Sequence, residues 1–242
     1  MRDLLYKFEK PYWENKFGQV KFSSISKQKL SYLFKYQPDI YKKVYDKFYK
    51  YIQKYDDYNE YFQNAKNETS KKIKSYIQGK KILSYGCGTA YIEEVNFPEE
   101  DITLMDSAKI NKFGKRTIHG EEILDVWKGN CLLAIQLVPH MNKTELRRFF
   151  QLSFRLLEDG GLIIITHKPR LNIVADIWDI TKNLLKIILY KNETFILWSW
   201  RRSDFFYEKL ANKNGFKLLS IEKNKYNDEN IMILKKIQQK SI

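Results

Sequence analysis

The chain has 242 residues, two cysteines and a formal net charge of +14. This length suits one sizeable domain with an elaboration, or two small domains, and the two distant cysteines exclude a disulfide framework and a cysteine-based zinc site. Charged residues interrupt both the N-terminus and the apolar stretch 184–200, so neither is typical of a signal peptide or a membrane-spanning helix. We therefore expect a cytoplasmic protein.

The charge is unevenly distributed along the chain. Residues 1–80 contain 18 Lys or Arg, 9 Asp or Glu and 12 of the 17 tyrosines. This bias is compatible with a nucleic-acid or anionic membrane partner. The interpretation that we favour is the lysine-, asparagine- and isoleucine-rich usage of an AT-rich genome. The composition changes near Gly79, which predicts a boundary between two structural units.

Before Gly79 the pattern is helical. Apolar residues recur at helical spacing over 40–55, after Pro38, and a second short helix is expected at about 68–78. Gly79 would end that helix as a C′ glycine. We expect residues 1–78 to form a helical extension or cap.

After Gly79, short apolar runs alternate with amphipathic windows, which predicts an α/β fold. The expected helices are 143–157, with Asn142 as N-cap, and 204–214, with Ser203 as cap and Gly215 as stop. A short connection makes the last two strands a hairpin. Residues 168–202 form a long insertion rich in aromatic side chains. The expected strands are 81–85, 102–105, 117–119, 131–135, 162–166, 216–222 and 231–235.

One segment indicates a ligand-binding site. An apolar strand is followed by a turn with Gly86 and Gly88, and a helix is expected after it. Such a turn lets a ligand lie against the backbone, with amides at the helix start facing it. A dinucleotide site is disfavoured because no third glycine follows at the required spacing. The segment 81–90 resembles motif I of the class I S-adenosylmethionine-dependent methyltransferases, whose usual form is Ile-Leu-Asp-x-Gly-Cys-Gly-Thr-Gly. The matching positions are Ile82, Leu83, Gly86, Cys87, Gly88 and Thr89.

The resemblance implies a Rossmann-like, doubly wound, seven-stranded sheet with a C-terminal antiparallel hairpin, in a methyltransferase domain over 79–242. It implies S-adenosylmethionine as the cofactor, bound at Tyr85, Gly86, Cys87 and Gly88. Two positions depart from the motif. Ser84 replaces the usual acid, which puts the strength of cofactor binding in doubt, and Ala90 replaces a third glycine at the strand–helix contact.

Further landmarks occur in the order that the family would have. Asp106 ends the second strand and resembles the acid that binds the ribose hydroxyls, with Ser107 beside it near the adenine. Glu121, or Glu122 after a one-residue slip, fits the position that holds the adenine amine. Gln136 would emerge near the transferable methyl group. A turn at 159–161 resembles the Gly-Gly entry to the fifth strand.

Methyl transfer needs alignment, and for an alcohol acceptor a base, for which His140 and His167 are the candidates. Arg201 and Arg202 are candidates for contacting an anionic substrate group. We expect O-methylation of a small molecule or glycan. The alternatives are an RNA methyltransferase, suggested by the charge, and a non-catalytic methyltransferase-like protein, suggested by Ser84 and Ala90.

Overall fold

A computed structural model describes residues 56–106, 117–118, 126–141, 143–169, 181, 202–226 and 229–237. All of these except Thr181 belong to one compact unit, which covers residues 49–169 and 200–242. The predicted helix over 40–55, the candidates Ser107, Glu121, Glu122 and Arg201, and nearly all of the 168–202 insertion lie outside the described residues.

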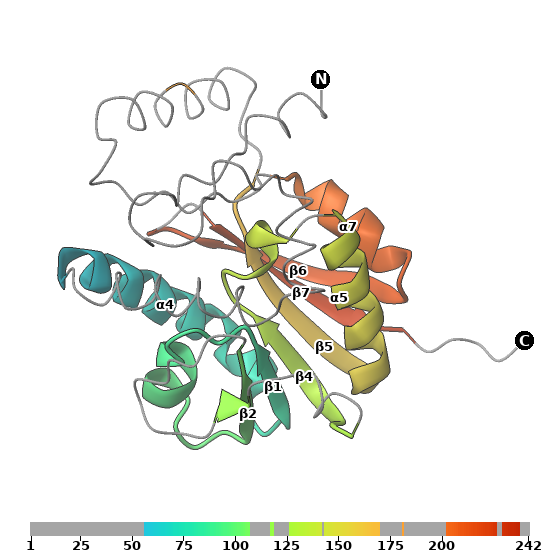
Figure 1. Cartoon of the computed structure of the whole chain (residues 1–242), viewed down its shortest axis with the longest axis horizontal. Coiled ribbons are helices and arrows are strands. Elements are labelled where there is room, and N and C mark those ends of the chain that lie inside the picture. The colour runs from blue at the N-terminus through green and yellow to red at the C-terminus, as the bar shows by residue number, and fades with distance from the viewer. Residues whose placement is uncertain are drawn as a thin grey trace, which may run out of the picture. The chain divides into compact units, whose positions relative to one another are not determined.

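A mixed β-sheet forms the centre of this unit, with hydrogen-bonded strands in the order β3-β2-β1-β4-β5-β7-β6 (Figure 1). Neighbours from β3 to β5 pair in parallel, and β7 pairs antiparallel with both β5 and β6. The expected α/β fold and the C-terminal hairpin are confirmed. The strands are β1 (Ile82–Tyr85), β2 (Ile102–Met105), β3 (Thr117–Ile118), β4 (Gly129–Ala134), β5 (Leu157–His167), β6 (Phe216–Asn224) and β7 (Glu229–Lys236).

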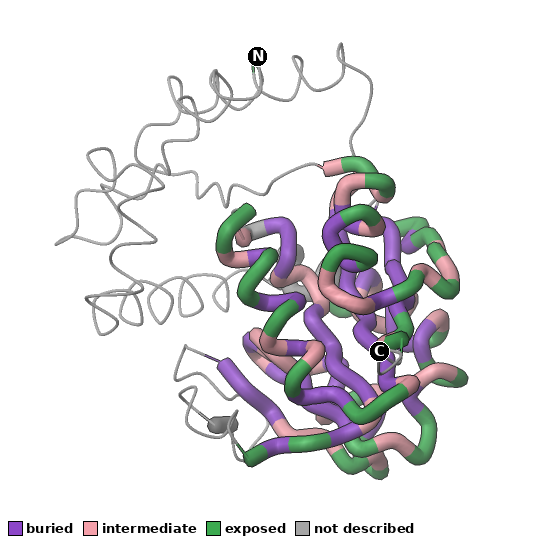
Figure 2. Tube along the Cα trace, turned by 90° about the vertical axis from the view of Figure 1, so that its right-hand side faces the viewer, coloured by how far each residue is buried: buried purple, intermediate pink, exposed green. Residues whose placement is uncertain are grey.

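Helices cover the sheet on both faces, because successive strand residues point to opposite sides. On β5, Ile163 and Ile165 pack in a core with α5 (Lys143–Leu156) and α7 (Asp204–Asn212). Ile164 faces the other way, toward a second core that includes α4 (Asp56–Ile77). Figure 2 shows buried segments at the centre of this unit and exposed residues around them.

The structure corrects the predicted start of β5. The strand begins at Leu157, directly after α5, and the predicted Gly-Gly turn lies within it. Gly129 pairs with Leu157 but Cys131 pairs with Leu162, so residues 158–161 form an irregularity in the ladder. Gly160 adopts a φ of +75°, which glycine tolerates without steric cost.

Helix α4 is also longer than predicted, since it begins at Asp56 rather than near Glu68. It ends before Gly79, at φ +67°, as expected, and the Gly79 amide donates to the Glu100 carboxylate at 3.0 Å. The Asn224 side chain on β6 donates to the Ala65 carbonyl at 2.7 Å. Helix α4 is therefore part of the sheet unit, while the predicted division at residue 78 stays a prediction.

Ser203 caps α7 as predicted, accepting a hydrogen bond from the Phe206 amide at 3.2 Å. Within the described ranges, none of the helices combines the length and apolar character that crossing a membrane requires.

Candidate functional site

The carboxyl ends of β1 and β2 bring the glycine turn and Asp106 together. The Gly86 and Cys87 amides donate to the Met105 carbonyl at 2.7 and 3.2 Å, which fixes the turn against the end of β2. The Gly88 amide then donates to Oδ2 of Asp106 at 2.7 Å. Asp106 is 5% exposed. The structure thus places the turn and the predicted ribose acid side by side.

The amides of the glycine turn itself are used within the protein, while the expectation that amides at the start of the following helix face a ligand stays a prediction. Those of Gly86, Cys87 and Gly88 bond within the protein, and the Ala90 amide donates to the Cys87 carbonyl at 2.9 Å. Because these donors are committed, they hold the shape of the turn. These particular amides are therefore already paired before any ligand binds.

Gly86 is required at its position for two reasons. Its φ is +75°, and a Cβ there would lie 2.7 Å from Cδ2 of Leu137, in the segment after β4. The missing side chain lets the turn approach Leu137, while the predicted approach of a ligand to this backbone stays a prediction.

The structure changes the kind of cost that we expect from Ala90, the residue that replaces the third glycine of the motif. The sequence suggested a steric cost of one methyl group at a strand–helix contact. Ala90 is instead fully buried with a φ of +54°, the left-handed region that glycine occupies freely. The cost of this departure from the motif therefore lies in the backbone conformation.

Ser84, the other departure, has an acidic partner that sequence reasoning missed. Its hydroxyl donates to Oε1 of Glu93 at 2.5 Å, and the two side chains are 2% and 3% exposed. Glu93 lies on the π-helical turn Ile92–Asn96 that follows the glycine turn. Burial raises the pKa of Glu93, and the Ser84 hydrogen bond and Lys66 oppose that shift. A carboxyl group is thus present beside the position where the motif usually has one.

Lys66 on α4 is the second residue that sequence reasoning missed. Its Nζ donates to Oγ1 of Thr89 at 3.3 Å and lies 5.9 Å from the centre of the Tyr91 ring. Burial lowers the pKa of Lys66, and the negative charge of Glu93 opposes this. The only signal in the sequence was a lysine on a predicted cap segment already rich in lysines.

Cys87 lies between the two glycines. Burial is the main cause that raises the pKa of its thiol, with Asp106 and Glu93 adding to it. The thiol therefore stays protonated at neutral pH and contributes volume and shape to the turn rather than a nucleophile.

Gln136 directs its side chain toward β7. It follows β4 with a φ of +57°, and its amide donates to Oγ1 of Thr166 at 2.7 Å. Its side-chain nitrogen donates to Oε2 of Glu229 at 3.5 Å. Its predicted place beside the transferable methyl group stays a prediction.

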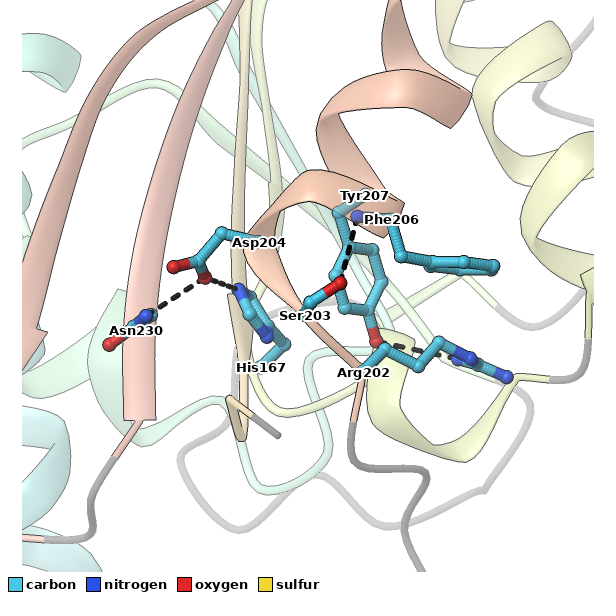
Figure 3. A network of polar contacts seen from close by, with 7 residues as sticks. All are labelled: His167, Arg202, Ser203, Asp204, Phe206, Tyr207 and Asn230. Carbon is cyan, nitrogen blue, oxygen red and sulfur yellow. Dashed lines mark hydrogen bonds and ion pairs between the residues drawn. The ribbon is translucent and has the colours of Figure 1, made fainter. Parts of the chain in front are cut away.

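His167, one of the two candidate bases, ends β5 and is fully buried (Figure 3). Its Nε2 lies 2.9 Å from Oδ1 of Asp204, and its ring centre lies 4.4 Å from that of Tyr207. Asn230 donates to the same Asp204 oxygen at 2.8 Å. Burial lowers the pKa of His167, and Asp204 opposes this. His167 thus joins the ends of β5, β7 and α7.

Arg202 connects the segment after β4 to α7. It donates to the Met141 carbonyl at 2.6 Å and to the Tyr207 hydroxyl at 3.4 Å, and its guanidinium lies 5.2 Å from the Phe206 ring centre (Figure 3). The 3₁₀ turn Val138–His140 ends just before Met141. The His140 side chain lies outside the described part of the chain.

No protein-family model matches the chain, and no curated protein sequence does. Solved structures do match. Human N-acetylserotonin methyltransferase in complex with S-adenosylmethionine matches with a TM-score of 0.62 and 11% identity, over 98% of this chain and 65% of that one. Magnesium protoporphyrin IX methyltransferase from Synechocystis, with bound S-adenosylhomocysteine, matches with a TM-score of 0.53 and 10% identity, over 73% and 84%.

A third match is the 1,6-didemethyltoxoflavin N1-methyltransferase of Burkholderia thailandensis, with a TM-score of 0.53 and 12% identity, over 72% of this chain and 79% of that one. The chain has the class I methyltransferase fold. The resemblance indicated by the glycine motif is thus confirmed for the fold, which is what similarity at 10–12% identity shows. In the methyltransferase fold, the glycine turn and Asp106 lie at the carboxyl ends of the strands, where open α/β sheets bind ligands.

Proposed function

We propose that this chain binds S-adenosylmethionine and transfers its methyl group to an oxygen atom of a small molecule or glycan. The observation that carries the proposal is the contact between the Gly88 amide and the Asp106 carboxylate at the ligand-binding edge of a methyltransferase fold. S-adenosylhomocysteine and S-adenosylmethionine are bound in similar solved structures, which supports the choice of cofactor.

Asp106 would bind the ribose. A carboxylate has about four acceptor sites, so it can hold the Gly88 amide and also accept hydrogen bonds from the ribose hydroxyls. Tyr85, Gly86 and Cys87 would form the floor under the nucleoside. Ser107 and Glu121 or Glu122 would contact the adenine, with Gln136 nearer the methyl group.

The cofactor supplies the reactive methyl group, and the protein aligns the acceptor and excludes water. An alcohol acceptor would need a base. His167 is fully buried against Asp204, which favours His140 as the base. Arg201 and Arg202 would lie toward the acceptor, although Arg202 already holds the Met141 carbonyl.

The proposal is tested by calorimetry with S-adenosylmethionine. We expect wild type to bind with micromolar affinity and Asp106→Ala to bind more weakly by about 2–3 kcal/mol, the loss of two hydrogen bonds to a charged group. Asp101→Ala is the matched control, because Asp101 is exposed at the other end of β2. Unchanged affinity in Asp106→Ala would refute the ribose placement. A wild-type chain that does not bind at millimolar ligand would support the non-catalytic alternative.

A further inference from the structure

The amino-acid end of S-adenosylmethionine carries a carboxylate that needs a donor or a cation. The amides of Gly86, Cys87 and Gly88 already bond to the Met105 carbonyl and the Asp106 carboxylate. The acids beside the turn, Asp106 and Glu93, would repel a ligand carboxylate. A cationic side chain beside the turn would give that carboxylate a charge-assisted hydrogen bond, which is stronger than a bond to a neutral donor.

Lys66 meets this requirement within the described residues. Its ammonium group contacts the Thr89 hydroxyl, one residue after Gly88, and its side chain is only partly buried. It comes from α4, which is fixed to the sheet unit by Ile73 and Ile77 in the core and by Asn224 at Ala65. The position of the ammonium beside the turn is thus set by a packed helix.

Glu93 helps to hold the Lys66 ammonium beside the glycine turn. The turn that carries Glu93 is bonded to α4 beside Lys66, because Asn96 accepts from the Ser70 hydroxyl at 3.0 Å and donates to Asn67 at 2.9 Å. Glu93 is thereby held near Lys66, and its negative charge opposes the lowering of the Lys66 pKa by burial. Ser84 in turn holds the Glu93 carboxyl by its hydroxyl. The two residues that sequence reasoning missed and the departure at Ser84 therefore form one arrangement.

We propose that Lys66 binds the carboxylate of the methionine part of S-adenosylmethionine, and that Glu93, held by Ser84, is the positioning residue for Lys66. This inference rests on the proposed function and deepens it. S-adenosylmethionine would then be bound at two places, with its ribose at Asp106 and its carboxylate at Lys66. Helix α4, outside the motif-bearing region, becomes part of the cofactor site.

The test compares two ligands by calorimetry on the full chain. S-adenosylmethionine has the amino-acid end, and 5′-methylthioadenosine lacks it. We expect Lys66→Met to weaken S-adenosylmethionine binding about 10- to 100-fold and to leave 5′-methylthioadenosine binding unchanged, as for loss of one charge-assisted hydrogen bond. Lys71→Met is the matched control, an exposed lysine on the same helix, and should change neither.

A second measurement needs no variant. Wild type should bind decarboxylated S-adenosylmethionine at least about tenfold more weakly than S-adenosylmethionine. Glu93→Gln should weaken S-adenosylmethionine but not 5′-methylthioadenosine. Adding Glu93→Gln to Lys66→Met should cause no further loss, because residues that act through one another are not additive.

The outcomes separate the inference from the proposed function. Equal wild-type affinity for the carboxylated and decarboxylated ligands overturns the Lys66 assignment while the methyl-donor site stands. Equal weakening of both nucleosides in Lys66→Met also overturns it, since that marks a general disturbance of the turn. A wild-type chain that binds neither S-adenosylmethionine nor 5′-methylthioadenosine overturns the proposed function and the inference with it.

Discussion

Glu93 is an acid that the fold buries almost completely under the glycine turn. Burial raises its pKa above the ordinary value of 4.5, so the folded chain releases this proton at a higher pH than the unfolded chain does. As the pH rises above that value, the unfolded chain loses its proton first and the free energy of unfolding falls. The fold therefore gives up stability at neutral pH to keep this carboxyl beside Lys66.

Glu93→Gln should recover that stability. The amide oxygen can still accept the Ser84 hydrogen bond, and the cost of desolvating the carboxylate, which outweighs its attraction to Lys66, is removed. We expect a higher Tm than wild type near pH 7 and no difference below about pH 4, where both states of wild type are protonated. Thermal unfolding across this pH range is the measurement, with the exposed Glu99→Gln as control. A variant less stable than wild type at pH 7 would contradict the assigned cause.

Ala90 tests the backbone argument. Ala90→Gly should change the free energy of unfolding by less than about 1 kcal/mol, because relief of the left-handed conformation opposes the lost methyl burial and the added chain entropy. Ala90→Val should cost about 2–3 kcal/mol, since a β-branched residue is strained at φ +54° and two added methyl groups must be accommodated at a fully buried position. Urea denaturation measures both. Equal stability of the two variants would refute the conformational explanation.

Among individual residues, the sequence could predict contacts between residues that follow the carboxyl ends of adjacent parallel strands. The pairing of Gly88 with Asp106 could be anticipated, because adjacent parallel strands bring their carboxyl ends to one edge. The contacts of Lys66 with Thr89 and of Ser84 with Glu93 could not. They depend on how α4 and the π-helical turn pack, and no local pattern encodes that packing.

Among the helices, the start of α7 was predicted correctly from a local sequence signal, the N-cap serine. Ser203 precedes the helix and accepts the Phe206 amide as the sequence predicted. Ser203→Ala should lower the free energy of unfolding by about 1 kcal/mol, the usual cost of losing an N-cap. Urea denaturation tests this, with Ser75→Ala on an exposed face of α4 as the control. A Ser203 variant as stable as the control would show that the cap contributes nothing.

Helix α4 shows where local signals failed. Its first residues, 56–67, are mostly polar and lack a clear apolar stripe, so the sequence predicted only the last part. Within 56–67, Ala65 is buried and its carbonyl accepts from Asn224 of β6, tertiary contacts that no local pattern in the sequence encodes. The predicted start of β5 was wrong for a similar reason, because pairing of Gly129 with Leu157 extends the strand beyond its apolar run.

For the whole molecule, the series of landmarks was more informative than any one of them. Alternating strands and helices, the glycine turn, the acid after β2 and the terminal hairpin appear in chain order, and their sum predicted the fold. Solved methyltransferases share that fold at only 10–12% identity. Their fold is therefore specified by the pattern of elements, while acceptor specificity depends on side chains that the pattern does not determine.

The net charge of +14 leads to a prediction about RNA. If the acceptor is a small molecule, binding of the full chain to unrelated RNA should be only electrostatic. We expect affinity weaker than about 1 µM at roughly 150 mM salt, falling steeply as salt increases. Filter binding over a salt series measures this. Submicromolar, sequence-dependent affinity at that salt would favour the RNA methyltransferase alternative.

The most direct test is a crystal structure of the full chain with S-adenosylhomocysteine. We predict that both ribose hydroxyls lie within hydrogen-bonding distance of the Asp106 carboxylate and that the nucleoside rests on the Gly86–Gly88 turn. A nucleoside bound elsewhere on the sheet, or a turn closed by its own side chains with the ligand excluded, would contradict the account.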